Sequence, residues 1–172
     1  MTGMSMSSLP YFFFGTLMDA EVRAIVLGGA LEAITTEAAS LEGYARLCVA
    51  KESYPTLRPA RGQRVHGLVV HGLAPEDERR IAYFEGVEYE LVPKHVRLPS
   101  GAEILARLFL DPGDLRTSGP WDFAQWQQRD KSALLEAARH FMKEFEVGAG
   151  RTTIDARWRA AWSRAKGPVL KG

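Results

Sequence analysis

The spacing of hydrophobic residues alternates between strand-like and helical periods, which divides the chain into predicted elements. The aromatic run at residues 11–14 is closed by Gly15 and predicts a short strand buried on both faces. Asp19 then stands where it can cap a helix, whose apolar residues keep helical spacing until Gly28. Residues 42–49 and 64–71 predict two more strands, with a loop rich in Pro, Arg and Gly at 54–62 between them.

The middle of the chain predicts one short helix and two further strands. Pro75 suits a first helical turn, the acidic residues 76–78 favour the positive end of that helix, and the helix ends at 84–86. The β-like runs at 89–98 and 104–110 bring the count to at least five strands with few helices between them. This order favours an α+β fold with a mostly antiparallel sheet or barrel over a doubly wound parallel sheet.

The hydrophobic period becomes helical after a loop at 111–120. Asp122 can cap a long helix, with Gln125 three residues on, and the helix ends before Gly148. Its apolar face comprises Leu134, Ala138, Phe141, Met142 and Phe145. A final helix is indicated by Ile154, Trp158, Trp162 and Ala165. We therefore expect a flexible N-terminus at 1–10, one domain at 11–150 and a basic amphipathic extension at 151–172.

Charge is distributed unevenly along the chain, although the net charge is close to zero. The chain has 22 Lys and Arg against 21 Asp and Glu, a formal net charge of +1, which excludes a globally basic nucleic-acid-binding protein. Residues 151–172, however, carry six basic residues and one acid, so this segment is basic and the remainder acidic. We expect the segment to dock on the acidic body or on a second copy in a homodimer. The alternative is a cationic helix that meets an anionic membrane or a nucleic acid.

The remaining composition predicts a soluble cytoplasmic protein. Cys48 is the one cysteine, so an internal disulfide is excluded. The longest apolar stretches fall far short of the roughly 20 residues of a membrane helix, which predicts no integral membrane segment. Residues 1–10 lack the pattern of a secretory signal.

Metal-ligand spacing is absent from the sequence. The histidines, His66, His71, His95 and His140, show no short zinc-type spacing. Cys48 has β-like surroundings and no adjacent base, so we expect a small buried filler rather than a nucleophile. The sequence predicts no metal site.

One candidate for ligand binding or catalysis is the glycine turn Phe14-Gly15-Thr16-Leu17, between a predicted buried strand and a helix. Glycine allows the backbone to approach a ligand, and successive amides there can point at an anion or an oxyanion. The alternative is an ordinary strand-to-helix turn without a function.

A second segment, residues 83–89, places Glu85 among aromatic residues at a helix end. An apolar environment disfavours the charged carboxylate, so its pKa rises from about 4.3 towards the range of a general acid and base. The alternative is a terminal glutamate that faces water. Glu88 and Glu90 alternate with Tyr89 and Leu91, as on a solvated strand face, and are poorer candidates than Glu85.

These two segments, about 70 residues apart, resemble the gamma-glutamylcyclotransferase-like superfamily, in particular its AIG2-like branch. Residues 14–17 match the family's Y-G-[ST]-L loop, and residues 84–86 with Tyr89 match its acidic signature, D-x-[FY]-E-G-x-x-Y. Gly43-Tyr44, Tyr54-Pro55, residues 65–69 and residues 121–126 look like the family's second strand, Tyr-Pro loop, Val-x-Gly strand and closing helix.

The resemblance implies a small mixed β-barrel with flanking helices, here with a long C-terminal helical region. It implies an acyl (aminoacyl) transferase that releases 5-oxoproline from a γ-glutamyl amine or dipeptide and needs no cofactor. Glu85 corresponds to the acid/base glutamate, and Gly15, Thr16 and Leu17 correspond to the loop that holds the substrate.

Two positions depart from the family pattern. Phe14 stands where the family has tyrosine, so a substrate hydrogen bond from that hydroxyl is lost or comes from Tyr11, Tyr54 or Tyr89, and we count Phe14, Tyr54 and Tyr89 among the substrate-binding residues. The aspartate of the family's acidic signature is also absent from this chain. Two alternatives follow, a ligand-binding or interaction module that has lost turnover and a different acyl-group transfer in the same pocket.

Overall fold

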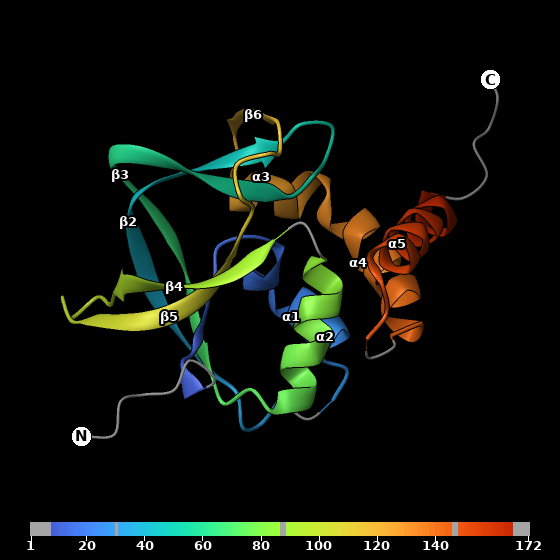
Figure 1. Ribbon diagram of the computed structural model, residues 1–172, viewed down its shortest axis with the longest axis horizontal. Helices are drawn as coiled ribbons and strands as arrows, with labels where there is room; N and C mark the ends of the chain where they lie inside the picture. The colour runs from blue at the N-terminus through green and yellow to red at the C-terminus, as the bar shows by residue number, and fades with distance from the viewer. Residues whose placement is uncertain (1–7, 30, 87–88, 146–147, 167–172) are drawn as a thin grey trace.

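Five strands close into a barrel, and a sixth strand lies outside it. The computed structural model describes residues 8–29, 31–86, 89–145 and 148–166 (Figure 1). The strands are β1 (Tyr11–Phe13), β2 (Thr35–Val49), β3 (Pro55–His71), β4 (Glu90–Arg97), β5 (Glu103–Leu110) and β6 (Thr117–Pro120). The helices are η2 (Thr16–Met18), a 3₁₀ turn, and α1 (Ala20–Leu27), α2 (Pro75–Glu85), α3 (Phe123–Arg129), α4 (Lys131–Lys143) and α5 (Arg151–Lys166).

The strand order confirms a mixed, mostly antiparallel barrel in an α+β fold. The order around the sheet is β3-β1-β5-β4-β2, and a further β3–β2 pairing closes it, with β6 beside β2. The pairing of β1 with β5 is parallel, and the other pairings are antiparallel. In Figure 1 the helices α4 and α5 lie side by side, away from strands β2 to β5.

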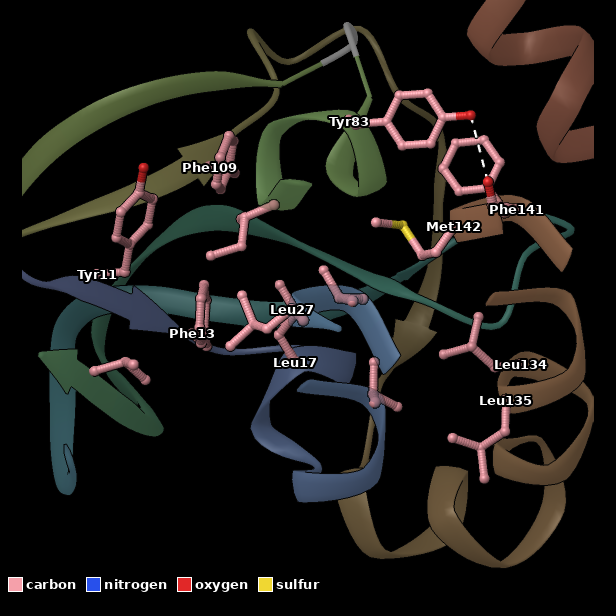
Figure 2. Close-up of a cluster of buried hydrophobic side chains, with 14 of the residues drawn as sticks. Tyr11, Phe13, Leu17, Leu27, Tyr83, Phe109, Leu134, Leu135, Phe141 and Met142 are labelled. Atoms are coloured by element: carbon pink, nitrogen blue, oxygen red, sulfur yellow. Dashed lines mark hydrogen bonds between the residues drawn. The ribbon is translucent and has the colours of Figure 1, made fainter. Parts of the chain in front are cut away.

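Strand β1 is buried on both faces, as its aromatic sequence predicts. Because side chains alternate along a strand, Phe12 and Phe14 point into the barrel core and Tyr11 and Phe13 face the helices. Figure 2 shows the second set, in which Tyr11 and Phe13 lie near Phe109 of β5 and the helices contribute Leu27, Leu134 and Phe141. Full burial of one such ring stabilises the fold by about 1.5–3 kcal/mol.

Two predicted loops are wrong, because strand pairing overrides their local composition. Residues 55–62 belong to β3 and pair with β2 in one long hairpin, with a register shift at Glu42/Tyr44 beside Gly43, whose φ is +84°. The two prolines, Pro55 and Pro59, sit opposite Cys48 and Tyr44 in that ladder. The predicted loop 111–120 ends in β6, which pairs with the end of β2. Partner strands supply these interactions, and a proline- and glycine-rich segment carries no local sign of them.

The predicted long helix after Asp122 consists of two helices, α3 and α4. The cap is as predicted, since the Asp122 carboxylate accepts a hydrogen bond from the Gln125 amide at 2.8 Å. The helix breaks at Asp130, a residue type that favours helix starts over helix interiors and whose φ here is −116°. The predicted apolar face is buried at Leu134, Ala138, Phe141 and Met142.

The two ends of the chain lie partly outside the described residues. Of the expected flexible segment 1–10, residues 1–7 fall outside them, whereas Leu9 is buried and its carbonyl accepts a hydrogen bond from Arg107 at 2.6 Å. Of the expected extension 151–172, the structure describes the helix α5, which packs on α4. Within the described ranges, no helix combines the length and apolar character that crossing a membrane requires.

Candidate functional site

A cavity of about 300 Å³ lies where the end of β1, the end of α2 and one face of α5 meet. Its size is at the lower end of the range for small-molecule sites. All seven site residues singled out in the sequence line it, namely Phe14, Gly15, Thr16, Leu17, Tyr54, Glu85 and Tyr89. The fold thus brings residues about 70 positions apart into one pocket.

The turn at Gly15 is held in place by two arginines that bond to its carbonyl groups. Arg46 Nη1 on β2 donates to the Phe14 carbonyl at 2.9 Å and to the His66 carbonyl at 3.0 Å. Arg23 Nη1 on α1 donates to the carbonyls of Leu17 and Met18 at 2.9 and 2.7 Å. The arginines therefore fix the peptide planes of this turn from the side of its carbonyl oxygens.

The amide groups of the same turn are available to a ligand. In a trans peptide the N–H points opposite to the C=O, so the Gly15 amide points away from Arg46. Across the described part of the chain, we find no hydrogen-bond acceptor for the amides of Gly15, Thr16 and Leu17. Unpaired amides on a pocket wall are suited to a carboxylate or a developing oxyanion.

Glycine at position 15 also keeps the pocket open beside Pro55. A Cβ atom at this position would lie 3.0 Å from Pro55 Cγ and 3.2 Å from Pro55 Cδ. Either the ring or the turn would have to shift to accept it. The turn and the start of β3 are therefore packed as closely as a residue without a side chain allows.

Glu85 is the last residue of α2, which ends because Gly86 adopts a φ of +85°. The preceding turn is anchored by Tyr83, whose ring stacks on Phe141 of α4 at a centroid distance of 4.3 Å. The Tyr83 hydroxyl donates towards the Phe141 carbonyl, as the dashed line in Figure 2 shows. Tyr83 thus ties the helix that carries Glu85 to α4.

Burial raises the pKa of Glu85 from its ordinary value of 4.5 to about 7. The residue is half-buried as a whole because it borders the cavity, but the surrounding walls are mostly aromatic and apolar. Its carboxyl group has neither an ion pair nor a hydrogen bond to any residue that the structure describes. A carboxyl group with a pKa near 7 can both accept and donate a proton at neutral pH.

Of the three tyrosines that could replace the missing family hydroxyl, two line the cavity. Tyr54 follows the β2–β3 turn and Tyr89 precedes β4, and both border the pocket. Tyr11 points to the helical side of β1, where Arg107 lies over its ring at 4.4 Å, and burial raises the pKa of its hydroxyl. Phe14 packs in the barrel core and also reaches the pocket wall.

The wall formed by α5 was not predicted from the sequence. Ile154, Asp155, Trp158 and Arg159 line the cavity from one face of this helix. The apolar spacing of Ile154, Trp158, Trp162 and Ala165 predicted a docked helix, and in the structure Ile154 is buried and Trp158 and Trp162 pack half-buried against the core. No sequence signal indicated that the helix would dock at the pocket itself, because its position depends on how it packs against α4.

The side chains around the cavity do not form a metal site. Among the residues with described positions, no three His, Cys, Asp or Glu side chains gather closely enough to hold a metal ion. Cys48 lies outside the cavity, where its thiol is directed at the Pro120 carbonyl at 3.7 Å and burial raises its pKa. A raised thiol pKa makes Cys48 a poor nucleophile.

Comparison with known proteins places the chain in a family. Residues 11–126 match the family described as gamma-glutamyl cyclotransferase, AIG2-like, and the chain belongs to that family. AIG2-like protein C of Arabidopsis thaliana is 27% identical over 147 residues, covering 84% of each chain. AIG2-like protein D of the same plant is 26% identical over 140 residues, covering 79% of this chain and 90% of its own.

Solved structures share the fold. An Arabidopsis thaliana protein solved in solution superposes with a TM-score of 0.58 at 23% identity, covering 83% of this chain and 87% of its own. A structure named gamma-glutamyl cyclotransferase superposes with a TM-score of 0.56 at 13% identity, covering 88% of this chain and 98% of its own. At these identities the comparison establishes the barrel architecture, and the family match ends before α4 and α5.

Proposed function

We propose that the protein is a γ-glutamyl cyclotransferase, which releases 5-oxoproline from a γ-glutamyl amine or dipeptide with Glu85 as general acid and base. The observation that carries this proposal is the shared pocket, whose lining includes a carboxyl group with a pKa of about 7 and three residues whose backbone amides have no acceptor among the described residues. Family membership supports the reaction class.

The chemistry requires one proton-transfer group and one site for negative charge. Glu85, as a carboxylate, takes a proton from the substrate's α-ammonium, and the freed nitrogen attacks the γ-carbonyl carbon of the same molecule. The new C–N bond closes the five-membered ring and leaves an oxyanion, and the amides of Gly15, Thr16 and Leu17, which line the cavity, are the donors proposed to stabilise it. Because both reacting groups belong to one molecule, holding the folded-back conformer contributes much of the acceleration.

Collapse of the tetrahedral intermediate completes the proton balance. The original amide C–N bond breaks, and Glu85 returns its proton to the leaving nitrogen. The α-nitrogen loses its second proton to water as it becomes the lactam N–H, and the released amine takes up one proton from water, so that the protons balance. No water is consumed and no oxidant or reductant enters the reaction.

The test is a panel of γ-glutamyl amines and dipeptides with 5-oxoproline as the measured product. We expect turnover by the intact protein and a loss of at least about 100-fold in Glu85→Gln, since positioned acid/base groups contribute about 10²–10⁴-fold. Glu90→Gln is the matched control, because Glu90 is an exposed glutamate of β4 that does not line the cavity. Undiminished turnover in Glu85→Gln refutes the role of Glu85.

The alternative of a binding module is favoured by Phe14, which lacks the hydroxyl of the family tyrosine. Its signature is a rise in melting temperature with a γ-glutamyl ligand and no product, because a ligand of the native state stabilises by mass action. A product other than 5-oxoproline in mass spectra would indicate a different acyl transfer.

A further inference from the structure

Helix α5 contributes one face to the cavity, and its placement there is fixed by aromatic packing. Trp158 meets Phe84 edge-to-face at 5.9 Å and Phe141 at 5.1 Å. Phe84 directly precedes Glu85, so α5 rests on the helix end that carries the candidate acid/base group. Arg157 closes the contact by donating to the Glu144 carbonyl at 2.8 Å.

Arg159 is distinguished from the other arginines of α5 by its lack of a carboxylate partner. Arg151 pairs with Asp155 at 3.9 Å, and Arg157 and Arg164 pair with Glu144 at 3.5 and 3.8 Å. For Arg159, the described ranges of the chain contain no ion pair and no hydrogen bond. Its guanidinium is therefore available to a ligand.

The charges around the cavity make this arginine significant. The ionisable acids that line it are Glu52, Glu85 and Asp155, and Arg159 is the cation among its lining residues that the structure describes. Without a cation these carboxylates would repel an anionic substrate. A guanidinium binds a carboxylate with two parallel hydrogen bonds, which gives this contact both strength and direction.

Differences in burial along the pocket indicate how a substrate would lie in it, with its glutamyl half at the buried end and its released half at the exposed end. Thr16 and Leu17 are buried, with 8% and 2% of their surface exposed, whereas Arg159 is exposed. The glutamyl half must reach Glu85 and the amides, so the released half extends towards α5 and solvent. Trp158, the residue before Arg159, also lines the cavity.

We infer that Arg159 binds the carboxylate of the released amino acid, so that the pocket prefers γ-glutamyl dipeptides over γ-glutamyl amines without a carboxylate. This inference rests on the proposed function and deepens it by naming the substrate class. Arg159 is a specificity-determining residue and takes no part in the proton transfers. It lies beyond the segment matched by the family, on the face of α5.

The experiment compares two substrates that differ by one carboxylate, γ-glutamyl-leucine and γ-glutamyl-isopentylamine. We expect the protein to favour γ-glutamyl-leucine, and we expect Arg159→Gln to lower the ratio of the two kcat/KM values by about 10- to 100-fold, the range for a hydrogen bond to a charged group. Arg159→Lys should restore part of the ratio because it keeps the charge without the planar fork. Arg164→Gln, on the same helix and outside the cavity, is the control and should leave the ratio at its original value.

The outcomes separate this inference from the proposed function. If both substrates release 5-oxoproline and Arg159→Gln leaves the ratio unchanged, the inference is overturned and the function stands. If neither substrate is turned over, the function fails, and calorimetric binding of the two compounds to Glu85→Gln, with and without Arg159→Gln, decides the inference. A Kd for γ-glutamyl-leucine that Arg159→Gln weakens about tenfold or more supports it, whereas equal Kd values or no binding overturn it.

Discussion

The pKa of Glu85 links the chemistry of the pocket to the stability of the fold, and Glu85→Gln measures the link. Its ordinary value is 4.5, and burial raises it to about 7 in the folded protein. Between pH 4.5 and about pH 7, Glu85 therefore keeps its proton in the folded protein and has lost it in the unfolded chain. Stability is full below about pH 4.5 and declines as the pH rises through 7.

The size of the decline follows from the two pKa values. A difference between 4.5 and about 7 corresponds to about 3 kcal/mol, since each pH unit contributes about 1.4 kcal/mol. The cost arises from ionising a carboxyl group that has no cation or donor to compensate it in the described part of the chain. Glutamine keeps the shape of the side chain and does not ionise, so the Gln variant avoids this cost.

The assay is urea unfolding of the intact protein and of Glu85→Gln at pH 5, 6, 7 and 8. The free energy of unfolding of Glu85→Gln minus that of the intact protein should increase by about 2–3 kcal/mol between pH 5 and pH 8. Taking the difference cancels every other group that titrates in both proteins. Parallel curves over this range would refute the raised pKa and, with it, the physical basis for Glu85 as an acid and base at neutral pH.

Three further changes test the parts that hold the pocket. Gly15→Ala places a methyl group 3.0 Å from Pro55 Cγ, so we expect kcat/KM for 5-oxoproline release to fall by about tenfold or more while the melting temperature changes little. Arg46→Met removes the hydrogen bonds to the Phe14 and His66 carbonyls, and urea unfolding should show a loss of about 1–3 kcal/mol, whereas an unchanged free energy of unfolding would contradict the role of Arg46 in holding the turn. Deletion from Arg151 onward exposes the aromatic surface under α5, and calorimetry should record a melting temperature lower by about 5–15 °C. An unchanged melting temperature would contradict the docking of α5 on the body.

The sequence was sufficient for those parts of the fold that local signals specify. The aromatic run at 11–14, the cap at Asp19 and the stop at Gly86 each depend on neighbours within a few residues, and the structure has each of them. The β2–β3 hairpin could not be predicted at its full length. Its outer half contains Pro55 and Pro59, and the interactions that make it a strand come from β2.

The pocket shows the same division between local and distant causes. Glu85 and the Gly15 turn carry local signatures, because Glu85 is followed by Gly86, the strand at 11–14 is followed by Gly15, and both segments contain aromatic residues. Arg46 gives no such signature, because its importance lies in the carbonyl of Phe14, which is 32 residues away. Arg159 was counted only as part of a basic segment, and its place on the pocket wall follows from the packing of Trp158 on Phe84 and Phe141.

The shortness of β1 determines when the pocket can form during folding. This strand of three residues pairs with Leu68 to Val70 of β3 and with Arg107 of β5, so its position depends on contacts that span most of the barrel sequence. Closing such long loops costs entropy before the contacts repay it, which makes distant pairings late events. The Gly15 turn continues directly from β1. We therefore expect the amides of the pocket to become ordered only in the last steps of folding, so that recovery of ligand binding trails the recovery of helical signal during refolding.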